Sequence, residues 1–410
     1  MSAAGSAATQ PLRGLEIVEC ATFVAGPSGC MALGQLGADV IRIDPIGGAA
    51  DHNRWPLAST GASLYWAALN KGKRSIALNL RDPRGREIAL ELATRPGPER
   101  GLFVDNAVGR SRLTYDELRA RRPDMIHLHI QGHADGRPAV DYTVNAEMGI
   151  PTITGPEDSA APVNHVLPAW DLLTGMHATT GLLAALHRRT TSGEGAHMEL
   201  ALADVAAAAV AGMGWLAEAE ERGTERQRLG NHLYGSYGSD FACGDGRRVM
   251  VVALTEAQWH ALQNVTGTTA VFRALQDAIG ADLDRESDRY ELRETIAAVI
   301  RPWFAARPLS QVVKELDAAK VLWSPYRTMP EVVADHRAND SLPVLADVDQ
   351  PGAGPIISAR PPLRWAGAYG TAAPAPLLGA DTEEILTGLG LDGTEIAALH
   401  DTGVVASART

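Results

Sequence analysis

The fold is decided near the amino terminus by residues 14–44, which read GLEIVECATFVAGPSGCMALGQLGADVIRID. Residues 14–21 are expected to form a short strand, and the turn at 25–29 leads into a helix that extends to Leu36. Gly37 is a typical helix end, and residues 38–44 have the apolar and β-branched character of a second strand. This order of strand, helix and strand predicts a βαβ unit and therefore an α/β fold with a parallel sheet.

The same unit invites comparison with nicotinamide-dependent dehydrogenases, because Asp44 ends its second strand. Those enzymes bind the pyrophosphate of the cofactor at a G-x-G-x-x-G turn. Here the turn reads Gly26-Pro27-Ser28-Gly29, which lacks the required glycine spacing. The sequence therefore disfavours a dinucleotide site.

The alternation of expected strands and helices continues to residue 221. Residues 133–170, rich in Pro, Gly and Asp, are expected to be mainly loops. Further strands are expected at 75–80, 102–105, 125–130 and 197–202, and further helices at 82–94, 172–189 and 203–221. In the helix from residue 172, small residues recur at helical spacing and should let another backbone approach closely: Gly175, Ala178, Gly181 and Ala185.

Three segments are predicted from these patterns. Residues 11–221 should form most of a large Rossmann-like α/β lobe, residues 222–329 a smaller α+β lobe, and residues 330–410 a return segment that completes the large lobe. In the smaller lobe we expect a hairpin turn at 244–246 and helices at 255–266, 290–306 and 309–319. In the return segment we expect an extended path at 351–376 and a helix at 381–389.

Composition excludes several classes of function. The 410 residues are 45% hydrophobic and carry a net charge of −12, which argues against a surface for nucleic acid or an anionic membrane. Three cysteines cannot build a disulfide framework, and residues 1–10 lack the apolar core of a secretion signal, so we expect a cytoplasmic protein. Because His, Cys and acidic residues show no clustered ligand spacing, no metal is expected.

Three short stretches could bind a ligand, and each has an ordinary alternative. Residues 70–75 (NKGKRS) place three cations around a glycine, which suits phosphates but also a solvated basic turn. Asp105 and Asn106 lie at the end of an expected strand, where ligands of open α/β folds bind, yet they could form a simple loop. Residues 230–238, rich in Gly and Tyr, could form a mobile lid or only a turn.

The fourth stretch is centred on Asp171, which directly precedes the helix expected from residue 172. An Asp at this position is above all a helix cap. The alternative is a nucleophile, and the two roles are compatible. Helix N–H groups would orient Asp171 and favour its anionic form, as covalent catalysis on a thioester requires.

Several stretches together resemble the class III (CaiB/BaiF) coenzyme A transferase family. The resemblance runs in the family's order from about residue 11 to 400 and is carried by residues 25–27 (AGP), 36–45 (LGADVIRIDP), 70–78 (NKGKRSIAL) and 374–379 (PAPLLG). It implies an acyl-CoA substrate, no cofactor beyond that CoA, and a homodimer of two interlocked rings. Residues 163–171 (VNHVLPAWD) and 230–235 (GNHLYG) are similar to the branch that moves CoA between the two carboxyls of one dicarboxylate, a step of the 3-hydroxypropionate route of carbon fixation.

The resemblance also implies roles for individual residues. Asp171 falls on the family nucleophile, and its acylation and exchange with CoA would carry the transfer. The implied CoA-binding residues are Lys73, Arg74, Asn106, Arg112 and Ala25, although Ala107 replaces the aromatic residue usual after that Asn. For the substrate pocket and the lid, the candidates are His165, Arg54, His52, Gly235 and Tyr234.

Other activities of the family remain as alternatives. Its racemases use a His–Asp pair, but Val140 stands at the His position, so a two-base racemisation would lack one proton carrier. An intermolecular transferase with a dicarboxylyl-CoA donor, or a CoA-binding protein without catalysis, would share most of the same residues. The intramolecular transferase is the expectation that the branch motifs favour.

Overall fold

The computed structural model describes residues 10–107, 109 and 113–408. They fall into two compact units, and each is described by itself. The large unit comprises the residues up to Met148, His165–Glu218 and the residues from Leu342 onward. The small unit comprises Gly149–Asn164 and Ala219–Ser341, so it includes a segment that the sequence assigned to the large lobe.

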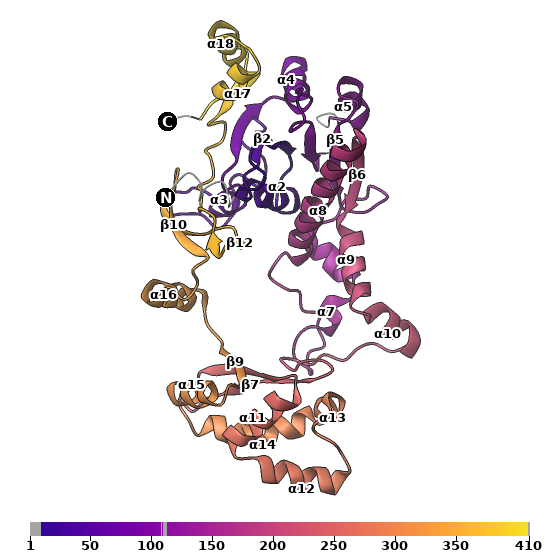
Figure 1. The fold of residues 1–410 in the computed structure, drawn as a ribbon, viewed down its shortest axis with the longest axis vertical. Coiled ribbons are helices and arrows are strands. Elements are labelled where there is room, and N and C mark those ends of the chain that lie inside the picture. Colours follow the sequence, from indigo (N-terminus) through magenta and orange to yellow (C-terminus); the bar gives the residue numbers. More distant parts are fainter. Residues whose placement is uncertain (1–9, 108, 110–112, 409–410) are drawn as a thin grey trace. The chain divides into compact units, whose positions relative to one another are not determined.

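The large unit is built on a seven-stranded sheet (Figure 1). Neighbouring strands are parallel except for the last strand of the chain, which pairs antiparallel with β3. In spatial order the strands are β14 (Val405–Ala406), β3 (Arg74–Leu78), β2 (Asp39–Asp44), β1 (Glu16–Cys20), β4 (Leu102–Asp105), β5 (Ile126–Gln131) and β6 (Ala196–Ala201). The predicted α/β class with a largely parallel sheet is confirmed.

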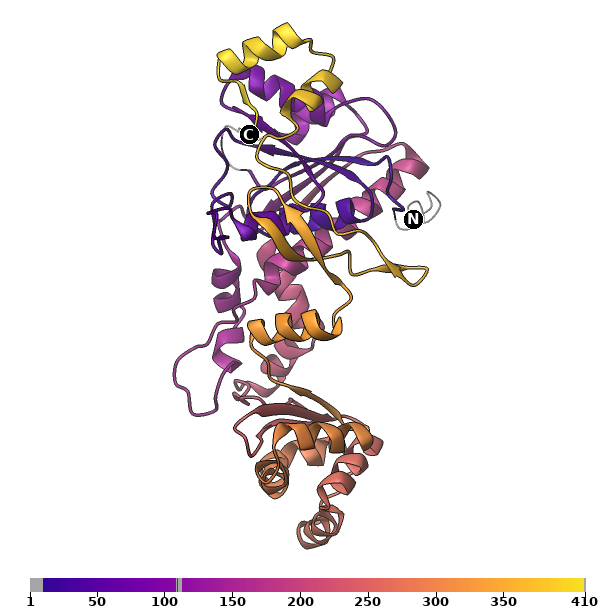
Figure 2. The same ribbon diagram turned by 90° about the vertical axis from the view of Figure 1, so that its left-hand side faces the viewer.

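Helices cover both faces of this sheet and produce three layers (Figure 2). On one face, Ile88 of α4 packs in the same core as Ile385 and Leu399 near the carboxyl end. On the other face, Leu33 and Ala178 pack over Ile17. Strands β1, β2 and β4 are buried along nearly their whole length, as expected for a sheet covered on both faces, and they carry buried charged residues such as Glu19, Arg42 and Asp105. The helices that contribute are α2 (Ala25–Gln35), α4 (Pro83–Ala93), α5 (Tyr115–Arg121), α8 (Ala169–Ser192), α17 (Thr382–Gly388) and α18 (Gly393–Asp401).

Helices α2 and α8 touch through glycine. A Cβ added at Gly29 would lie 2.6 Å from the carbonyl oxygen of Gly175, and Thr179 donates a hydrogen bond to the carbonyl of Gly29 at 3.1 Å. The close backbone approach predicted from the small residues of α8 is therefore confirmed at Gly175. This contact fixes the helix that carries Asp171 against the helix that follows β1.

The segment between β5 and α8 differs from the prediction. The region expected to be mainly loops contains α6 (Asp141–Glu147), whose seven residues are too few to produce a clear helical period. The helix expected at 203–221 is divided into α9 (Leu202–Gly212) and α10 (Trp215–Arg222) by Gly214, which has a positive φ of 76°. Short helix α3 (Leu64–Leu69) was not predicted either.

The return segment is more structured than an extended path. It contains two hairpins, β10 (Leu345–Gln350) with β11 (Gly354–Ala359) and β12 (Arg364–Trp365) with β13 (Ala368–Tyr369). At the start of the segment predicted for the return path, α16 (Met329–Asn339) begins at a capping box formed by Thr328 and Glu331, a signal that the prediction overlooked, and this helix belongs to the small unit.

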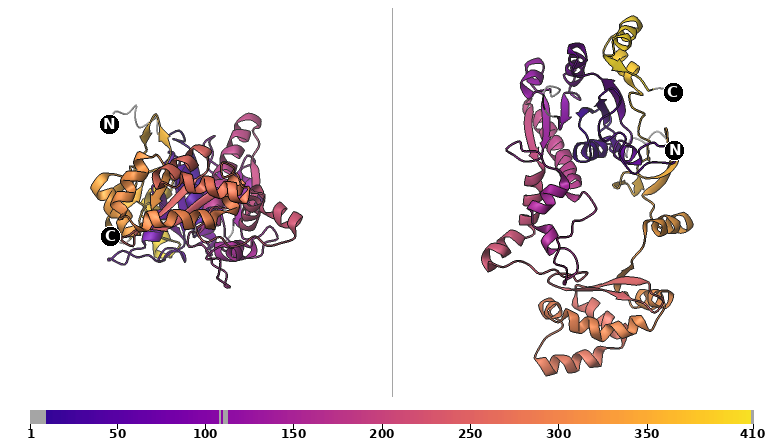
Figure 3. Two further views of the ribbon diagram at one scale, coloured as in Figure 1. Left: turned by 90° about the horizontal axis from the view of Figure 1, so that it is seen from below. Right: turned by 180° about the vertical axis from the view of Figure 1, so that it is seen from behind.

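The small unit is an α+β structure with an antiparallel sheet of β7 (Tyr237–Ala242), β8 (Arg248–Ala253) and β9 (Leu322–Pro325). The predicted turn at 244–246 joins β7 to β8. Helices gather on one face of this sheet, over a core that contains Trp259 and Phe304 (Figures 1 and 3). They are α11 (Glu256–Thr266), α12 (Thr269–Ile279), α13 (Glu286–Glu291), α14 (Arg293–Ala305) and α15 (Leu309–Ala318), and a short α7 (Ile150–Ile153) also belongs to the unit.

Among the described residues no single helix has the length and apolar character needed to cross a membrane. The bent pair α9 and α10, with a 67° change of direction, meets that test only when the two helices are taken together.

Candidate active site

Asp171 lies inside the first turn of α8 and does not cap it. The helix begins at Ala169 after Pro168, three residues earlier than predicted, and Asp171 is half-buried. The carboxylate that receives the first N–H groups belongs to Asp141. Its Oδ2 accepts hydrogen bonds from the backbone N–H of Trp170 at 2.8 Å and of Asp171 at 3.2 Å. The helix-cap interpretation of Asp171 is therefore wrong.

Asp141 connects three parts of the site. It is 2% exposed at the start of α6, and its Oδ1 lies 2.9 Å from Nε2 of His165. The Trp170 indole N–H donates to Oδ1 of Asn145, one turn further along α6, at 3.1 Å. These bonds hold the segment before α8 against α6. Local sequence pattern does not predict this role, because Asp141 is thirty positions away from the backbone N–H of Asp171 that it binds.

The pKa of Asp171 is displaced upward by this arrangement. Burial, and then the charge of Asp141, raise the pKa from 3.8 to about 7, while the Arg54 guanidinium acts in the opposite direction. We had expected helix N–H groups to favour the Asp171 anion, but those groups are directed to Asp141. Asp171 is instead a carboxyl that ionises near neutral pH, which is the range in which an acid, base or nucleophile is most useful.

Arg54 is held beside Asp171 by aromatic rings. Its guanidinium carbon lies 5.6 Å from the ring centre of Phe23 and 5.3 Å from that of Tyr65. Burial, opposed by Arg54 and aided by Asp171, raises the pKa of Tyr65 to about 12. Among the described residues, no carboxylate lies within ion-pair distance of Arg54. The site therefore contains a cation that remains available to an anionic ligand.

The loop after β1 is fixed by two polar side chains. The amide of Asn106 both accepts from the N–H and donates to the carbonyl of Thr22, each at 3.0 Å. Asp51 accepts a hydrogen bond from the N–H of Phe23 at 2.9 Å. Phe23 has a positive φ of 67°, a conformation that costs a non-glycine residue energy, so the Asp51 bond helps to hold it. Asn106 was predicted to bind CoA, and in this structure its amide positions the loop.

Buried ion pairs lie behind this loop. Arg42 contacts Asp44 at 2.8 Å and Asp51 at 3.1 Å, and it donates to Asn70 at 3.0 Å. The pKa of Arg42 is raised because these carboxylates outweigh the cost of burial. Phe23, in the loop after β1, is thus connected through Asp51, in the loop after β2, to the strands of the central sheet.

Two predicted CoA-binding cations have protein partners. The Lys73 ammonium is 2.6 Å from Glu19, and it donates to Asn70 at 2.9 Å and to the carbonyl of Pro27 at 3.0 Å. Lys73 is 4% exposed, and burial lowers its pKa. Arg74 pairs with Asp39 and, at 3.4 Å, with Glu384. Their role in binding CoA stays a prediction. In this structure both side chains form ion pairs within the large unit and so stabilise its fold.

Three further residues predicted to bind CoA or the substrate are Ala25, His52 and Arg112. Ala25 is buried as the first residue of α2. The His52 ring packs edge-to-face on Trp66 at 5.2 Å, and its Nδ1 is buried with no hydrogen-bond partner among the described residues. Arg112 lies outside the described residues.

The expected lid belongs to the small unit. There the Tyr234 ring lies under the Arg226 guanidinium at 3.6 Å and near the Tyr290 ring at 5.2 Å. Gly235 has a positive φ of 74° within the turn that precedes β7. These contacts define an ordered turn in the small unit.

One group of three possible metal ligands occurs in the described part of the chain. Glu256, His260 and Asp284 approach one another on the small unit, where all three are exposed and His260 pairs with Asp284 at 2.8 Å. None of them belongs to the site around Asp171.

A doubly covered parallel sheet and a carboxyl of raised pKa at the start of a helix are features that suit an α/β enzyme of acyl or group transfer. The CoA-transferase family III profile matches residues 12–382, so the chain belongs to CoA-transferase family III.

The relatives of this chain agree with that assignment. It is 47% identical over 399 residues to the 2-methylfumaryl-CoA isomerase of Chloroflexus aurantiacus, with 96% of this chain and 98% of that protein covered. It is 28% identical over 394 residues to the succinyl-CoA:mesaconate CoA-transferase of Haloarcula marismortui, with 92% and 96% covered. The fold matches a CAIB/BAIF family protein from Brucella suis with a TM-score of 0.75 at 24% identity, covering 93% of this chain and 100% of that one.

The raised pKa of Asp171 predicts a pH-dependent gain of stability in Asp171→Asn. The folded protein keeps the Asp171 proton up to about pH 7, whereas the unfolded chain loses it near pH 4. Wild type therefore loses stability as the pH rises through this window, and the variant does not. Urea unfolding should show a gain of about 1–3 kcal/mol at pH 8 and none at pH 4.

Asp204→Asn is the matched control, because Asp204 is also the third residue of its helix but is exposed. It should show no gain that grows with pH. Equal stability differences at pH 4 and pH 8 in Asp171→Asn would contradict the raised pKa.

Proposed function

We propose that this chain transfers CoA between the C1 and C4 carboxyls of mesaconate, converting 2-methylfumaryl-CoA into 3-methylfumaryl-CoA. The observation that carries the proposal is the 47% identity to a 2-methylfumaryl-CoA isomerase over 96% of the chain. The position of Asp171 beside Arg54 supports it, because the reaction needs a nucleophilic carboxylate and the substrate has a spare anionic carboxylate.

The proposed reaction begins with attack of the Asp171 carboxylate on the C1 thioester carbonyl. Collapse expels CoA thiolate and leaves a mixed anhydride of mesaconate and Asp171. The thiolate then attacks the aspartyl carbonyl, which yields an Asp171–CoA thioester and releases mesaconate as a carboxylate within the site.

The second half repeats these steps at the other end of the dicarboxylate. Mesaconate turns so that its C4 carboxylate attacks the Asp171–CoA thioester, and thiolate is expelled again as the C4 anhydride forms. Thiolate attacks the mesaconyl C4 carbonyl, gives 3-methylfumaryl-CoA and frees the Asp171 carboxylate. No atom is gained or lost, and no oxidant or cofactor beyond the CoA of the substrate is required.

The raised pKa of Asp171 suits this role. A carboxylate whose conjugate acid has a pKa near 7 is a stronger nucleophile than an ordinary one and is still ionised in a large fraction of molecules at neutral pH. The electrostatic effect of Arg54 favours the ionised form that attacks.

Arg54 is the best of the three predicted residues for binding the spare carboxylate. His165 is already paired with Asp141, and His52 is packed on Trp66. The Arg54 guanidinium is held between two rings and has no carboxylate partner among the described residues, so it can form charge-assisted hydrogen bonds with a ligand. By holding the carboxylate that is not reacting, Arg54 would keep mesaconate in place while it turns.

The proposal extends to assembly and location. We propose the interlocked homodimer implied by the family and a cytoplasmic, metal-free enzyme. The ordered set of motifs shared with the family supports this, and we propose no nucleic-acid or membrane partner because the net charge of −12 suits neither.

Intermolecular CoA transfer is the second candidate function. The 28% identity to a succinyl-CoA:mesaconate CoA-transferase favours it, since such an enzyme could use the same Asp171 chemistry on a separate acid. The two functions differ in whether free mesaconate enters the product. A CoA-binding protein without catalysis is disfavoured, because Asp171 is in place with a pKa suited to chemistry.

Covalent trapping tests the nucleophile. With 2-methylfumaryl-CoA and hydroxylamine or borohydride, wild type should give an adduct or a reduced side chain, and peptide mass should locate it at Asp171. Asp171→Ala should lose turnover by at least about 10⁴-fold and give no adduct while still binding CoA. Asp204→Asn, altered at the equivalent position of α9, should behave as wild type. Turnover by Asp171→Ala, or an adduct elsewhere, would refute the mechanism.

Labelled free mesaconate tests both intramolecularity and Arg54. During turnover by wild type, product should contain no label. In Arg54→Met, we expect kcat/KM to fall by about 10- to 100-fold, the loss expected for one charge-assisted pair, and label to enter the product because mesaconate escapes. Arg54→Lys should restore part of the activity.

Arg119→Met provides the control, since it removes an exposed arginine of α5. Label in the wild-type product would favour the intermolecular function. Unchanged kinetics and label exclusion in Arg54→Met would show that another residue binds the spare carboxylate.

A further inference from the structure

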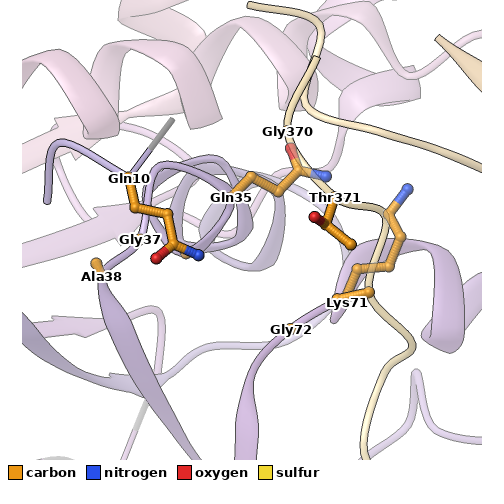
Figure 4. Close-up of a pocket in the computed structure, with 10 residues that line it drawn as sticks. Gln10, Gln35, Gly37, Ala38, Lys71, Gly72, Gly370 and Thr371 are labelled. Carbon is orange, nitrogen blue, oxygen red and sulfur yellow. The ribbon is translucent and has the colours of Figure 1, made fainter. Parts of the chain in front are cut away.

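The large unit contains a cavity of about 260 Å³ at an edge of its sheet (Figure 4). The last turn of α2, the residues before β2 and β3, and the segment at 370–373 surround it. Its lining residues are Gln10, Gly34, Gln35, Gly37, Ala38, Lys71, Gly72, Gly370, Thr371 and Ala373.

Lys71 is the only charged residue among the described residues of this lining, and it is 9% exposed. Burial lowers the pKa of its ammonium. Among the described residues it has neither an ion pair nor a hydrogen bond. The other two buried cations of this region are compensated, Arg42 by Asp44 and Lys73 by Glu19. A buried charge normally has a partner of opposite charge. Lys71 has none among the described residues, which suggests that its partner is a ligand.

The other polar side chains around the cavity are neutral hydrogen-bond donors. Figure 4 shows Gln10, Gln35 and Thr371 around the same space as Lys71. The Gln10 carbonyl oxygen accepts from Arg13, which leaves its NH₂ group as a donor. A buried cation that shares a cavity with amide and hydroxyl groups, with no acidic residue among its ten described lining residues, has the chemistry of an oxyanion site.

In the described part of the chain, the backbone carbonyls at the end of α2 do not accept a hydrogen bond from the Lys71 ammonium, and two of them have other donors. At the end of α2, the carbonyl of Gly34 already accepts from Gly37, and that of Leu36 accepts from Leu12. The segment that closes the cavity is itself anchored, because Gly72 donates to the carbonyl of Pro374 at 2.8 Å. The cavity is therefore a fixed part of the large unit.

This cavity is separate from the site around Asp171. Ala38 and Gly72 precede β2 and β3, so they lie at the amino-terminal edge of the parallel sheet. Thr22, Asp51 and Asn106 follow β1, β2 and β4, so the loops that shape the candidate active site lie at the carboxyl-terminal edge. A ligand at Lys71 would not contact the reacting atoms.

We propose that the cavity binds a compact oxyanion, a carboxylate or phosphate group, through an ion pair with Lys71 and hydrogen bonds from Gln10, Gln35 and Thr371. The occupied site stabilises the start of β3 and the return segment that crosses it. This binding is independent of the proposed CoA transfer, and its test does not use turnover.

Thermal unfolding and calorimetric titration of the full chain test the proposal, with inorganic phosphate and succinate as the two probes. Wild type should gain stability as either anion is added, by the mass-action effect of a ligand that binds the folded state. In Lys71→Met the affinity should fall at least tenfold. In anion-free buffer this variant should unfold at a higher temperature than wild type, because an uncompensated buried charge has been removed.

Lys314→Met, which removes an exposed lysine of α15, should retain the wild-type response. Tighter binding of phosphate or of succinate would show which kind of oxyanion the site selects, and both results support it. The proposal is overturned if wild type shows no anion-dependent gain, or if Lys71→Met shows the same gain as wild type. It is also overturned if Lys71→Met changes the oligomeric state and leaves anion binding intact, since Lys71 would then serve a contact between copies.

Discussion

The candidate active site depends on the carboxylate of Asp141 accepting the first backbone N–H groups of α8. One of its oxygens fixes where the helix starts and therefore where Asp171 lies. The other binds His165 and restrains the segment that enters the helix. Its negative charge, added to burial, raises the pKa of Asp171 to about 7. One carboxylate thus fixes the position of the proposed nucleophile and adds to the effect of burial on its pKa.

The part of the site that contains Arg54 depends on a buried ion pair between Arg42 and Asp51. Arg42 binds Asp51, Asp51 holds the backbone of Phe23 in a left-handed conformation, and Phe23 supports the Arg54 guanidinium. Because buried ion pairs lose much energy if one partner is removed, this chain of contacts tolerates little change. It connects the central strands of the sheet to Arg54, the cation that opposes the upward shift of the Asp171 pKa, and it explains how a loop residue can be held in a defined place.

The sequence predicted the features that depend on local pattern. The βαβ unit followed from residues 14–44, and strands close to those observed followed from the alternation of apolar runs. The start of α8 was misplaced, since an Asp before an apolar helix is usually its cap and nothing nearby indicated that Asp141 would take that role. Lys73 was interpreted as solvated or phosphate-binding, because a basic turn does not reveal that Glu19 lies beneath it. Both errors have the same cause, which is that the residue that determines the local structure lies far away in the sequence.

The pH dependence of kcat/KM in wild type and in Asp141→Asn tests the central claim most directly. Asn can still accept the N–H groups of Trp170 and Asp171, but it lacks the charge that adds to burial in raising the pKa of Asp171. We predict that activity in wild type falls as the pH decreases below about 7, and that this acidic limb of the profile moves to lower pH in Asp141→Asn. The same limb in both enzymes, with Asp141→Asn folded, would contradict it.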